Sequence, residues 1–270
     1  MSLSTVIKLG GRVARQPFLS KVAMDVTSLR SRIKFVVVHG GGDLVTAYAQ
    51  KLNVPQRFVV SPSGIRSRLT DDETLNLCIM VMGGLVNTAV VQALEAEKVQ
   101  AVGLTGADCS LIKAIRKERI VVINEGRKMV TDGRRSGKPL TINVSFLRGL
   151  LDMGITPVIA PLGSDQDGQM VNMDGDSVAA AIASALKADT LLFLSDVDGV
   201  IDGGRVLNRC ALPEVEALAR TAGYGMNRKL LAAVAALKGG VGRVIISNGK
   251  AEKPVSTALF EGRGTVISDV

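Results

Sequence analysis

Short apolar runs that end in glycine or a polar residue alternate along the chain with stretches of helical periodicity. Apolar residues recur every three or four positions through 71–98, 177–187 and 213–237, as on one face of a helix. The runs that read as buried strands lie at 5–9, 35–39, 101–104, 156–160, 191–195 and 243–247. Continuous apolar strands that alternate with helices are typical of a parallel sheet covered on both faces. The pattern predicts an α/β fold, a three-layer αβα sandwich around a mainly parallel central sheet.

One segment departs from this rhythm. Residues 120–123 and 128–131 flank a turn of Asn, Glu and Gly, which predicts an antiparallel hairpin. Residues 200–206, with two glycines at their centre, predict a second hairpin. We find no internal repeat, low-complexity tract or linker, so we expect residues 1–270 to form a single domain whose two lobes share one sheet.

Composition narrows the possible functions. Hydrophobic residues make up 47% of the 270, which is enough for a large core. Apolar runs such as 191–194 fall short of the ~20 residues of a bilayer span, and the start of the chain lacks the order of a signal peptide. We therefore expect a soluble, cytoplasmic protein with no membrane partner. The three scattered cysteines and the single histidine, His39, exclude most zinc sites, disulfide frameworks and Ser-His-Asp triads.

The net charge of +8 is concentrated in one segment. Residues 113–138 hold nine Lys or Arg and three acids, a net +6. Such a run is commonly a solvated hairpin face, but it can also bind nucleic acid, a membrane surface or an acidic protein. Because the run has no interleaved aromatic residues, a base-stacking surface is disfavoured and we expect no nucleic acid partner. A compact acidic protein remains a possible partner of this segment.

Glycines follow the first two predicted strands, at Gly10-Gly11 and at 40–42. Where a parallel strand ends in glycine and a helix begins, free backbone N–H groups and the helix dipole favour phosphate. The same glycines could merely permit tight turns. Neither a G-x-x-x-x-G-K-S/T loop nor a strand-linked G-x-G-x-x-G pattern is present. Any nucleotide would therefore be bound by a different kind of loop, typical of another fold.

Charged residues stand at the ends of the predicted strands. Lys8 interrupts an apolar strand, and a lysine buried without a partner costs several kcal/mol, so we expect it to face a polar site. Lys229 opposes the dipole at a helix start, which suggests an external anion. Of Asp174 and Asp176, one is expected to cap the next helix. Two carboxylates beside Asn172 can also hold lysines or a hydrated Mg²⁺.

These features together favour phosphoryl transfer, which needs mainly positioning and charge neutralisation. The sequence offers no plausible general base. A carboxylate acceptor is already ionised at neutral pH and needs none, so acyl-phosphate formation fits better than phosphorylation of an alcohol.

The chain resembles the amino acid kinase family, specifically its N-acetylglutamate kinase branch. The matching segments follow the family's order over nearly the whole length: 7–11 (Ile-Lys-Leu-Gly-Gly), 39–42 (His-Gly-Gly-Gly), 64–66 (Gly-Ile-Arg), 103–106 (Gly-Leu-Thr-Gly), 172–176 (Asn-Met-Asp-Gly-Asp), 194–200 (Leu-Ser-Asp-Val-Asp-Gly-Val), 225–229 (Gly-Met-Asn-Arg-Lys) and 264–267 (Gly-Thr-Val-Ile).

The resemblance implies an amino-terminal lobe, residues 1–170, for the acyl acceptor and oligomerisation, and a carboxy-terminal lobe, residues 171–270, for ATP with Mg²⁺. Lys8 and Lys229 would flank the transferred phosphoryl group, and Asp176 would hold both. The resemblance implies no metal ligands in the protein, because Mg²⁺ would be held mainly by the ATP phosphates. The implied binding residues are Gly41, Gly42, Arg66 and Asn172 for the substrate and Gly10, Gly11, Ser195, Asp196, Val197, Gly225 and Met226 for the nucleotide.

Two departures refine the resemblance. Residues 103–108 read Gly-Leu-Thr-Gly-Ala-Asp, without the lysine of many kinases acting on free N-acetylglutamate. Residues 61–68, Ser-Pro-Ser-Gly-Ile-Arg-Ser-Arg, look like the subgroup whose substrates are attached to a small acidic LysW-type carrier protein. That subgroup phosphorylates carrier-bound α-aminoadipate or glutamate in lysine or arginine biosynthesis. A kinase of free N-acetylglutamate and a non-catalytic sensor are the alternatives, and a homodimer is expected from the family.

The two neighbouring arginines, Arg66 and Arg68, are expected to have different roles. Arg66 is assigned to the α-carboxylate end of the amino acid. In an extended segment Arg68 is expected to point the opposite way, toward the carrier or a neighbouring acid. A helix capped by Thr70, with Glu73 completing a capping box, should follow. The residues expected to contact the carrier are Arg68, Lys113, Arg116, Lys117, Arg119, Arg134 and Arg135, since an acidic protein would be steered to such a cluster.

Overall fold

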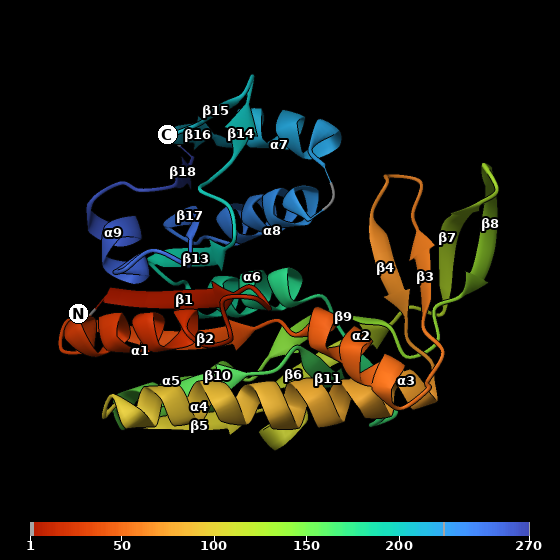
Figure 1. Ribbon diagram of the computed structural model, residues 1–270, viewed down its shortest axis with the longest axis horizontal. Helices are drawn as coiled ribbons and strands as arrows, with labels where there is room; N and C mark the ends of the chain where they lie inside the picture. The colour runs from red at the N-terminus through yellow and green to blue at the C-terminus, as the bar shows by residue number, and fades with distance from the viewer. Residues whose placement is uncertain (1–2, 224, 270) are drawn as a thin grey trace.

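An eight-stranded sheet forms the centre of the computed structural model, which describes residues 3–223 and 225–269 (Figure 1). The strand order is β16-β18-β17-β13-β1-β2-β10-β5, and only the β17–β18 pair is antiparallel. The strands are β1 (Leu3–Leu9), β2 (Ile33–His39), β5 (Ala101–Leu104), β10 (Thr156–Ile159), β13 (Thr190–Ser195), β16 (Arg209–Ala211), β17 (Arg243–Asn248) and β18 (Thr265–Ser268). All six predicted strands belong to this sheet, so the predicted α/β fold is confirmed.

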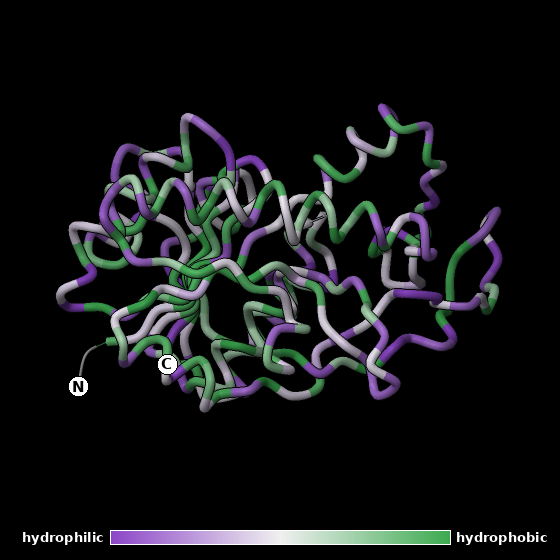
Figure 2. Tube along the Cα trace, turned by 90° about the horizontal axis from the view of Figure 1, so that it is seen from below, coloured by the Kyte–Doolittle hydropathy of each residue, from purple (hydrophilic) through white to green (hydrophobic). Residues whose placement is uncertain are grey.

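The alternation of side chains explains why these strands are apolar throughout. In β2, Val36 and Val38 pack into the core on one face, while Phe35 and Val37 pack into the core on the other. Successive side chains of a strand point to opposite faces, so the middle of a strand covered on both sides is apolar at consecutive positions, and the polar residues of β2, Lys34 and His39, stand near its ends. Each such side chain contributes about 1.5–3 kcal/mol on burial. Figure 2 shows these strands as apolar tubes through the middle of the molecule.

Helices form the two outer layers. One face is covered by α5 (Val144–Asp152), α6 (Gly175–Leu186), α7 (Leu212–Thr221) and α8 (Met226–Lys238). The other is covered by α1 (Phe18–Leu29), α2 (Gly42–Lys51), α3 (Asp72–Cys78), α4 (Asn87–Ala96) and α9 (Pro254–Phe260). The apolar stretch 213–237 is thus two helices, separated around Gly223 and Gly225. Tyr224, between these two glycines, lies outside the described residues.

A single helical run joins α3 to α4 through the π-helical segment η1 (Ile79–Val86). Its N-cap is Asp71, whose side chain accepts a hydrogen bond from the Thr74 backbone N–H at 2.9 Å, so the predicted Thr70 cap is wrong. At 25 residues, 72–96 is long and apolar enough to span a bilayer by length and composition, which the sequence reading missed. Because 44% of its most apolar stretch is buried and it packs on α1 and β5, a core helix accounts for the same composition.

Two smaller sheets flank the carboxyl edge of the central one. The strands β3 (Arg57–Val60), β4 (Arg66–Leu69), β7 (Arg119–Asn124) and β8 (Arg127–Asp132) form two neighbouring hairpins that project from the body (Figure 1). The other sheet contains β6 (Ile112–Arg116), β9 (Gly137–Ile142), β11 (Leu162–Ser164) and β12 (Met170–Asn172), and η2 (Asp108–Ser110) precedes it. Both predicted hairpins exist, the second as β14 (Ile201–Asp202) and β15 (Arg205–Val206).

Candidate active site

Three adjacent central strands, β13, β1 and β2, end side by side above a cavity of about 590 Å³. The loops that follow them, at Gly10-Gly11, 40–42 and Ser195-Asp196, all line this cavity. Ligands of parallel sheets gather at the carboxyl ends of the strands, so the topology itself places a binding site here.

Two lysines share one buried carboxylate at the floor of the cavity. Lys8 Nζ lies 2.7 Å from Asp176 Oδ1, and Lys229 Nζ lies 3.2 Å from Asp176 Oδ2. The Asp176 side chain is only 5% exposed. Burial would raise the pKa of Asp176, but the charges of Lys8 and Lys229 outweigh it and lower the pKa. Asp176 therefore stays ionised, and two lysines around one carboxylate give the cluster a formal net charge of +1.

The neighbouring carboxylate has a different task. Asp174 is the N-cap of α6, because its Oδ2 accepts from the backbone N–H of Ser177 at 2.9 Å. Asp176, two residues on, turns toward the lysines. The prediction that one of the two aspartates caps the helix is confirmed.

The glycine loops leave backbone donors facing the cavity. The N–H groups of Gly10 and Gly40 donate to Leu194 and Leu9 at 2.8 Å, which fixes the loops to the strands. Within the described residues, the N–H groups of Gly11, Gly41 and Gly42 have no acceptor. Gly42 also begins α2, so the helix dipole adds to these donors.

A side chain at these glycines would intrude on the site's own walls. A Cβ at Gly11 would lie 2.6 Å from Asp43 Oδ1. At Gly41 it would lie 3.1 Å from Met82 Cγ. Close packing around the loop, not only turn geometry, therefore favours glycine here, and it lets an anion approach the backbone.

The loop carrying these donors is fixed from beneath by the single histidine. His39 is fully buried; its Nδ1 lies 2.9 Å from the Gly40 carbonyl and its Nε2 3.1 Å from Asn87 Nδ2. A carbonyl only accepts, so Nδ1 carries the proton and Nε2 accepts from Asn87. Burial lowers the pKa of His39 to about 4, helped by the charge of Lys8 and opposed by the bond to Gly40.

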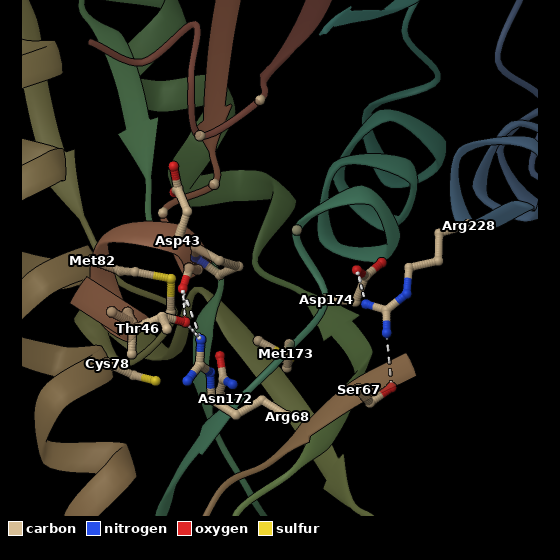
Figure 3. A pocket seen from close by; sticks show the side chains of 18 of the residues that line it. Asp43, Thr46, Ser67, Arg68, Cys78, Met82, Asn172, Met173, Asp174 and Arg228 are labelled. Carbon is tan, nitrogen blue, oxygen red and sulfur yellow. Dashed lines mark hydrogen bonds and ion pairs between the residues drawn. The ribbon is translucent and has the colours of Figure 1, made fainter. Parts of the chain in front are cut away.

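Arginines from β4 form the opposite wall. Arg66 and Arg68 both stack on Phe58, with guanidinium carbons 4.1 and 4.8 Å from the ring centroid. Arg68 donates to the Gly42 carbonyl at 2.7 Å and to Thr46 Oγ1 at 2.8 Å (Figure 3). The prediction that Arg68 points away from Arg66 is wrong, because residues two apart in a strand lie on the same face.

Asn172 closes this side of the cavity, where its Nδ2 donates to Thr70 Oγ1 at 3.0 Å. The cavity as a whole is lined by seven basic residues, Lys8, Arg12, Arg66, Arg68, Lys117, Arg228 and Lys229, and by three aspartates, Asp43, Asp174 and Asp196. Arg12 pairs with Asp196 at 2.8 Å. This excess of cations suits a ligand with several negative charges.

Several predicted residues lie elsewhere. Val197, Gly225 and Met226 do not line the cavity; Gly225 is the N-cap of α8 and Met226 its first residue. Three of the expected carrier contacts are ion-paired within the chain: Arg116 with Asp165, Arg134 with Asp71 and Arg135 with Asp72. Lys113 and Arg119 are exposed, and within the described part of the chain neither has an ion-pair partner. Arg68 and Lys117 line the cavity.

Arg228 is the residue that the sequence reading missed. It donates to Asp174 Oδ1 at 2.9 Å, to Ser67 Oγ at 2.8 Å and to the Arg66 carbonyl (Figure 3). Its only signal in the sequence was a second cation beside Lys229 at the same helix start. Nothing there indicated that two of its three partners, Arg66 and Ser67, come from a hairpin about 160 residues earlier.

Residues 4–248 match the model of the amino acid kinase family. The chain belongs to this family. Related proteins support the assignment: it is 40% identical over 266 residues to the LysW-aminoadipate/LysW-glutamate kinase of Saccharolobus solfataricus, covering 98% of this chain and 99% of the relative. The corresponding protein of Sulfolobus acidocaldarius is 41% identical over 264 residues, 97% of this chain and 99% of the relative.

Solved structures share the fold. N-acetylglutamate synthase from Neisseria gonorrhoeae superposes with a TM-score of 0.81 and 27% identity over 98% of this chain, which spans 59% of that longer protein. Carbamate kinase from Giardia lamblia, bound to AMP-PNP, gives 0.67 at 20% identity, covering 99% of this chain and 98% of the other. The chain is therefore a kinase, and kinases of this family use ATP.

Proposed function

We propose that the chain transfers the γ-phosphoryl group of ATP to the side-chain carboxylate of α-aminoadipate and/or glutamate attached to a small acidic LysW-type carrier protein. The product is an acyl phosphate of lysine and/or arginine biosynthesis. The observation that carries the proposal is the pair of lysines on Asp176, which faces a wall of arginines across one cavity. The names of the relatives, which refer to LysW-bound aminoadipate and glutamate, support the part of the proposal that involves a carrier protein.

The proposed chemistry assigns a role to each member of the cluster. Lys8 and Lys229 neutralise charge on the transferred phosphoryl group from two sides, and Asp176 fixes the distance between them. Gly11, Gly41 and Gly42 donate backbone N–H bonds to phosphoryl and acceptor oxygens. The acceptor carboxylate attacks without a general base, because it is ionised at neutral pH.

Magnesium is expected to arrive with the nucleotide. Within residues 3–223 and 225–269, no group of three His, Cys, Asp or Glu side chains gathers to hold a metal ion. Asp176 is already occupied by two lysines. We therefore assign Mg²⁺ to the ATP phosphates, where it would shield their charge.

The two ends of the cavity receive the two substrates in this proposal. Arg66 and Asn172 bind the α-carboxylate end of the acceptor, in a lobe of about residues 1–170. Within the cavity the nucleotide lies against Gly10, Gly11, Ser195 and Asp196. It extends beyond the cavity lining toward Val197, Gly225 and Met226, so most of its contacts are in residues 171–270. Arg66 suits its part because its planar guanidinium has no ion-pair partner in the described chain and can bind a carboxylate bidentately.

The projecting hairpins supply a surface for the carrier. Register places Val60 opposite Ile123, and Val121 opposite Val130, so these residues share a face with Phe58, Arg66 and Arg68. The face has Arg119 and Lys128 near its ends, and Asp132 lies opposite Arg119. It thus runs from the cavity outward as an apolar stripe with cations beside it, which fits an acidic protein better than a flat basic surface would.

One assay separates this proposal from its alternative. Purified protein is given MgATP with carrier-bound α-aminoadipate, carrier-bound glutamate or free N-acetylglutamate, and acyl phosphate is trapped with hydroxylamine. We expect turnover of a carrier-bound substrate only. Vigorous turnover of the free compound alone would identify an N-acetylglutamate kinase, and tight ATP binding without any turnover would indicate a sensor.

Charge reversal tests the docking face. Arg119→Glu with Lys128→Glu should raise the KM for the carrier-bound substrate at least tenfold at low salt, and the loss should shrink as salt screens the charges. A matched control, Arg220→Glu with Lys253→Glu, changes the same charge at exposed positions on α7 and before α9. Equal losses in both pairs would remove the hairpin face from the proposal.

We also propose a cytoplasmic homodimer. Met80 and Leu85, on the outer side of η1, are 59% and 46% exposed. Large apolar side chains exposed together on one helix commonly mark a protein interface. This face belongs to the lobe expected to mediate oligomerisation.

A further inference from the structure

Arg228 joins three elements at the side of the cavity: α8, on which it lies, α6 and β4. It projects from the first turn of α8, directly before Lys229. Its guanidinium donates to the α6 N-cap Asp174 at 2.9 Å and to Ser67 of β4 at 2.8 Å, and also to the backbone carbonyl of Arg66. In Figure 3 the side chain reaches across from α8 with Asp174 on one side and Ser67 at its tip.

The contacts link the two halves of the reaction site. Ser67 lies between Arg66 and Arg68, so a bond to it and to the Arg66 carbonyl fixes both flanking arginines. Asp174 and Arg228 lie next to the phosphoryl cluster in the chain, two residues before Asp176 and one before Lys229. One guanidinium therefore sets the distance between the arginine wall and the lysine pair.

Within the described residues, the β3–β4 hairpin pairs with β7 at one position, Val60 opposite Ile123. It projects from the body, and its strand β3 is exposed or half-buried along its length (Figure 1). Arg68 also holds it, through the Gly42 carbonyl and Thr46 of α2. The hairpin is thus attached to α2 by Arg68 and to α8 by Arg228, on either side of the cavity.

Arg228 also separates two hollows. Ser67, Lys117, Asp174 and Arg228 line both the reaction cavity and a second groove of about 530 Å³ between α6 and α8. The Arg228 guanidinium therefore stands in the wall between the groove and the cavity. Closure of such a site excludes water from phosphoryl transfer.

We propose that Arg228 is a positioning residue: it latches β4 to Asp174 and so holds Arg66 and Arg68 at a fixed distance from Lys229 and Asp176. The inference rests on the proposed function, because it assigns the acceptor to the β4 side of the cavity. Arg228 acts on the acceptor through β4 and on ATP hardly at all.

The first measurement needs no substrate. Hydrogen exchange is followed in the unliganded protein for peptides covering 57–69, in the wild type, in Arg228→Met and in Arg228→Lys. We expect at least tenfold faster exchange in both variants, because a lysine keeps the charge but not the planar fork that reaches Asp174 and β4 together. Arg220→Met, at an exposed arginine of α7, should leave this exchange unchanged.

The second measurement separates positioning from general damage. With carrier-bound substrate, Arg228→Met should raise the acceptor KM about tenfold or more, since each hydrogen bond to a charged group is worth roughly that factor. The KM for ATP should change less than about threefold. Ser67→Ala should have a smaller effect, and that effect should vanish in the Arg228→Met background.

Several outcomes would overturn the latch: unchanged exchange of 57–69, equal rises in both KM values, or full recovery with Arg228→Lys, which would indicate a charge effect alone. If the wild type phosphorylates no carrier-bound acceptor, the proposed function fails. The exchange experiment still decides the latch in that case.

Discussion

His39 offers a sharp quantitative prediction, because it is the only histidine of the chain. Its pKa is lowered to about 4 by burial, against 6.5 for the ordinary side chain. In the unfolded chain the imidazole binds a proton near pH 6.5, whereas in the folded protein it stays neutral to about pH 4. The unfolded state therefore binds more protons between these values, and stability must fall as the pH is lowered through this window.

The size follows from the two pKa values. A pKa shift of this extent contributes about 3 kcal/mol in total to the free energy of unfolding. About 2 kcal/mol of this contribution is lost when the pH is lowered from 7 to 5. Carboxylates with a lowered pKa, such as Asp176 and Asp196, lose their contribution only below about pH 4, so they do not obscure this window. Protonation of Nε2 would also remove the acceptor that Asn87 uses.

The assay is urea unfolding at pH 7, 6 and 5, for the wild type and for His39→Gln. We expect the wild type to lose about 2 kcal/mol and the variant, which has no titrating group at this position, to lose almost nothing over the same range. Because the chain has one histidine, the Cε1–H resonance of its imidazole gives the pKa directly by NMR. Equal slopes in the two proteins, or a titration near 6.5 in the folded state, would refute the assignment of His39 as a buried neutral support of the glycine loop.

Three further predictions concern the cluster and the exposed helix. Lys8→Met should lower kcat by about 10²–10³ while the Kd for ATP, measured by calorimetry, changes far less. Asp176→Asn should lower the free energy of unfolding in urea by about 3–5 kcal/mol, because it leaves two buried ammonium groups unpaired. Added inorganic phosphate should restore part of this stability. An unchanged unfolding midpoint would contradict the pairing of Asp176 with the two lysines. Met80→Glu with Leu85→Glu should convert a dimer to a monomer in light scattering, while Met153→Glu, at an equally exposed methionine, should not.

The sequence predicted the central sheet because burial on both faces produces uninterrupted apolar runs, as in β2 and β13. It did not predict β16, whose three residues carry too short a pattern to be read. Nor did it predict the π-helical form of η1, since apolar spacing alone does not distinguish helix types.

The site divides in a similar way. The lysines could be found because each contradicts its local surroundings: Lys8 interrupts an apolar strand, and Lys229 opposes a helix dipole. The basic segment 113–138 was taken as one hairpin face, but its strands belong to two different sheets. Arg228 could not be identified because its partners are set by tertiary packing and leave no local trace.

The buried charge of the cluster links these observations to function. Two lysines and one aspartate leave a net charge of +1 in a nearly dry place, and a protein selected for stability alone would have supplied a second carboxylate or an apolar core. The missing negative charge is one that a phosphate-bearing ligand brings. The free N–H groups of Gly11 and Gly41, which are half-buried and buried, point to the same conclusion, because such donors without acceptors are costly unless a ligand completes them. The unbalanced charge and the unpaired donors converge on one cavity, so both are best explained by the phosphoryl group that passes between its two walls.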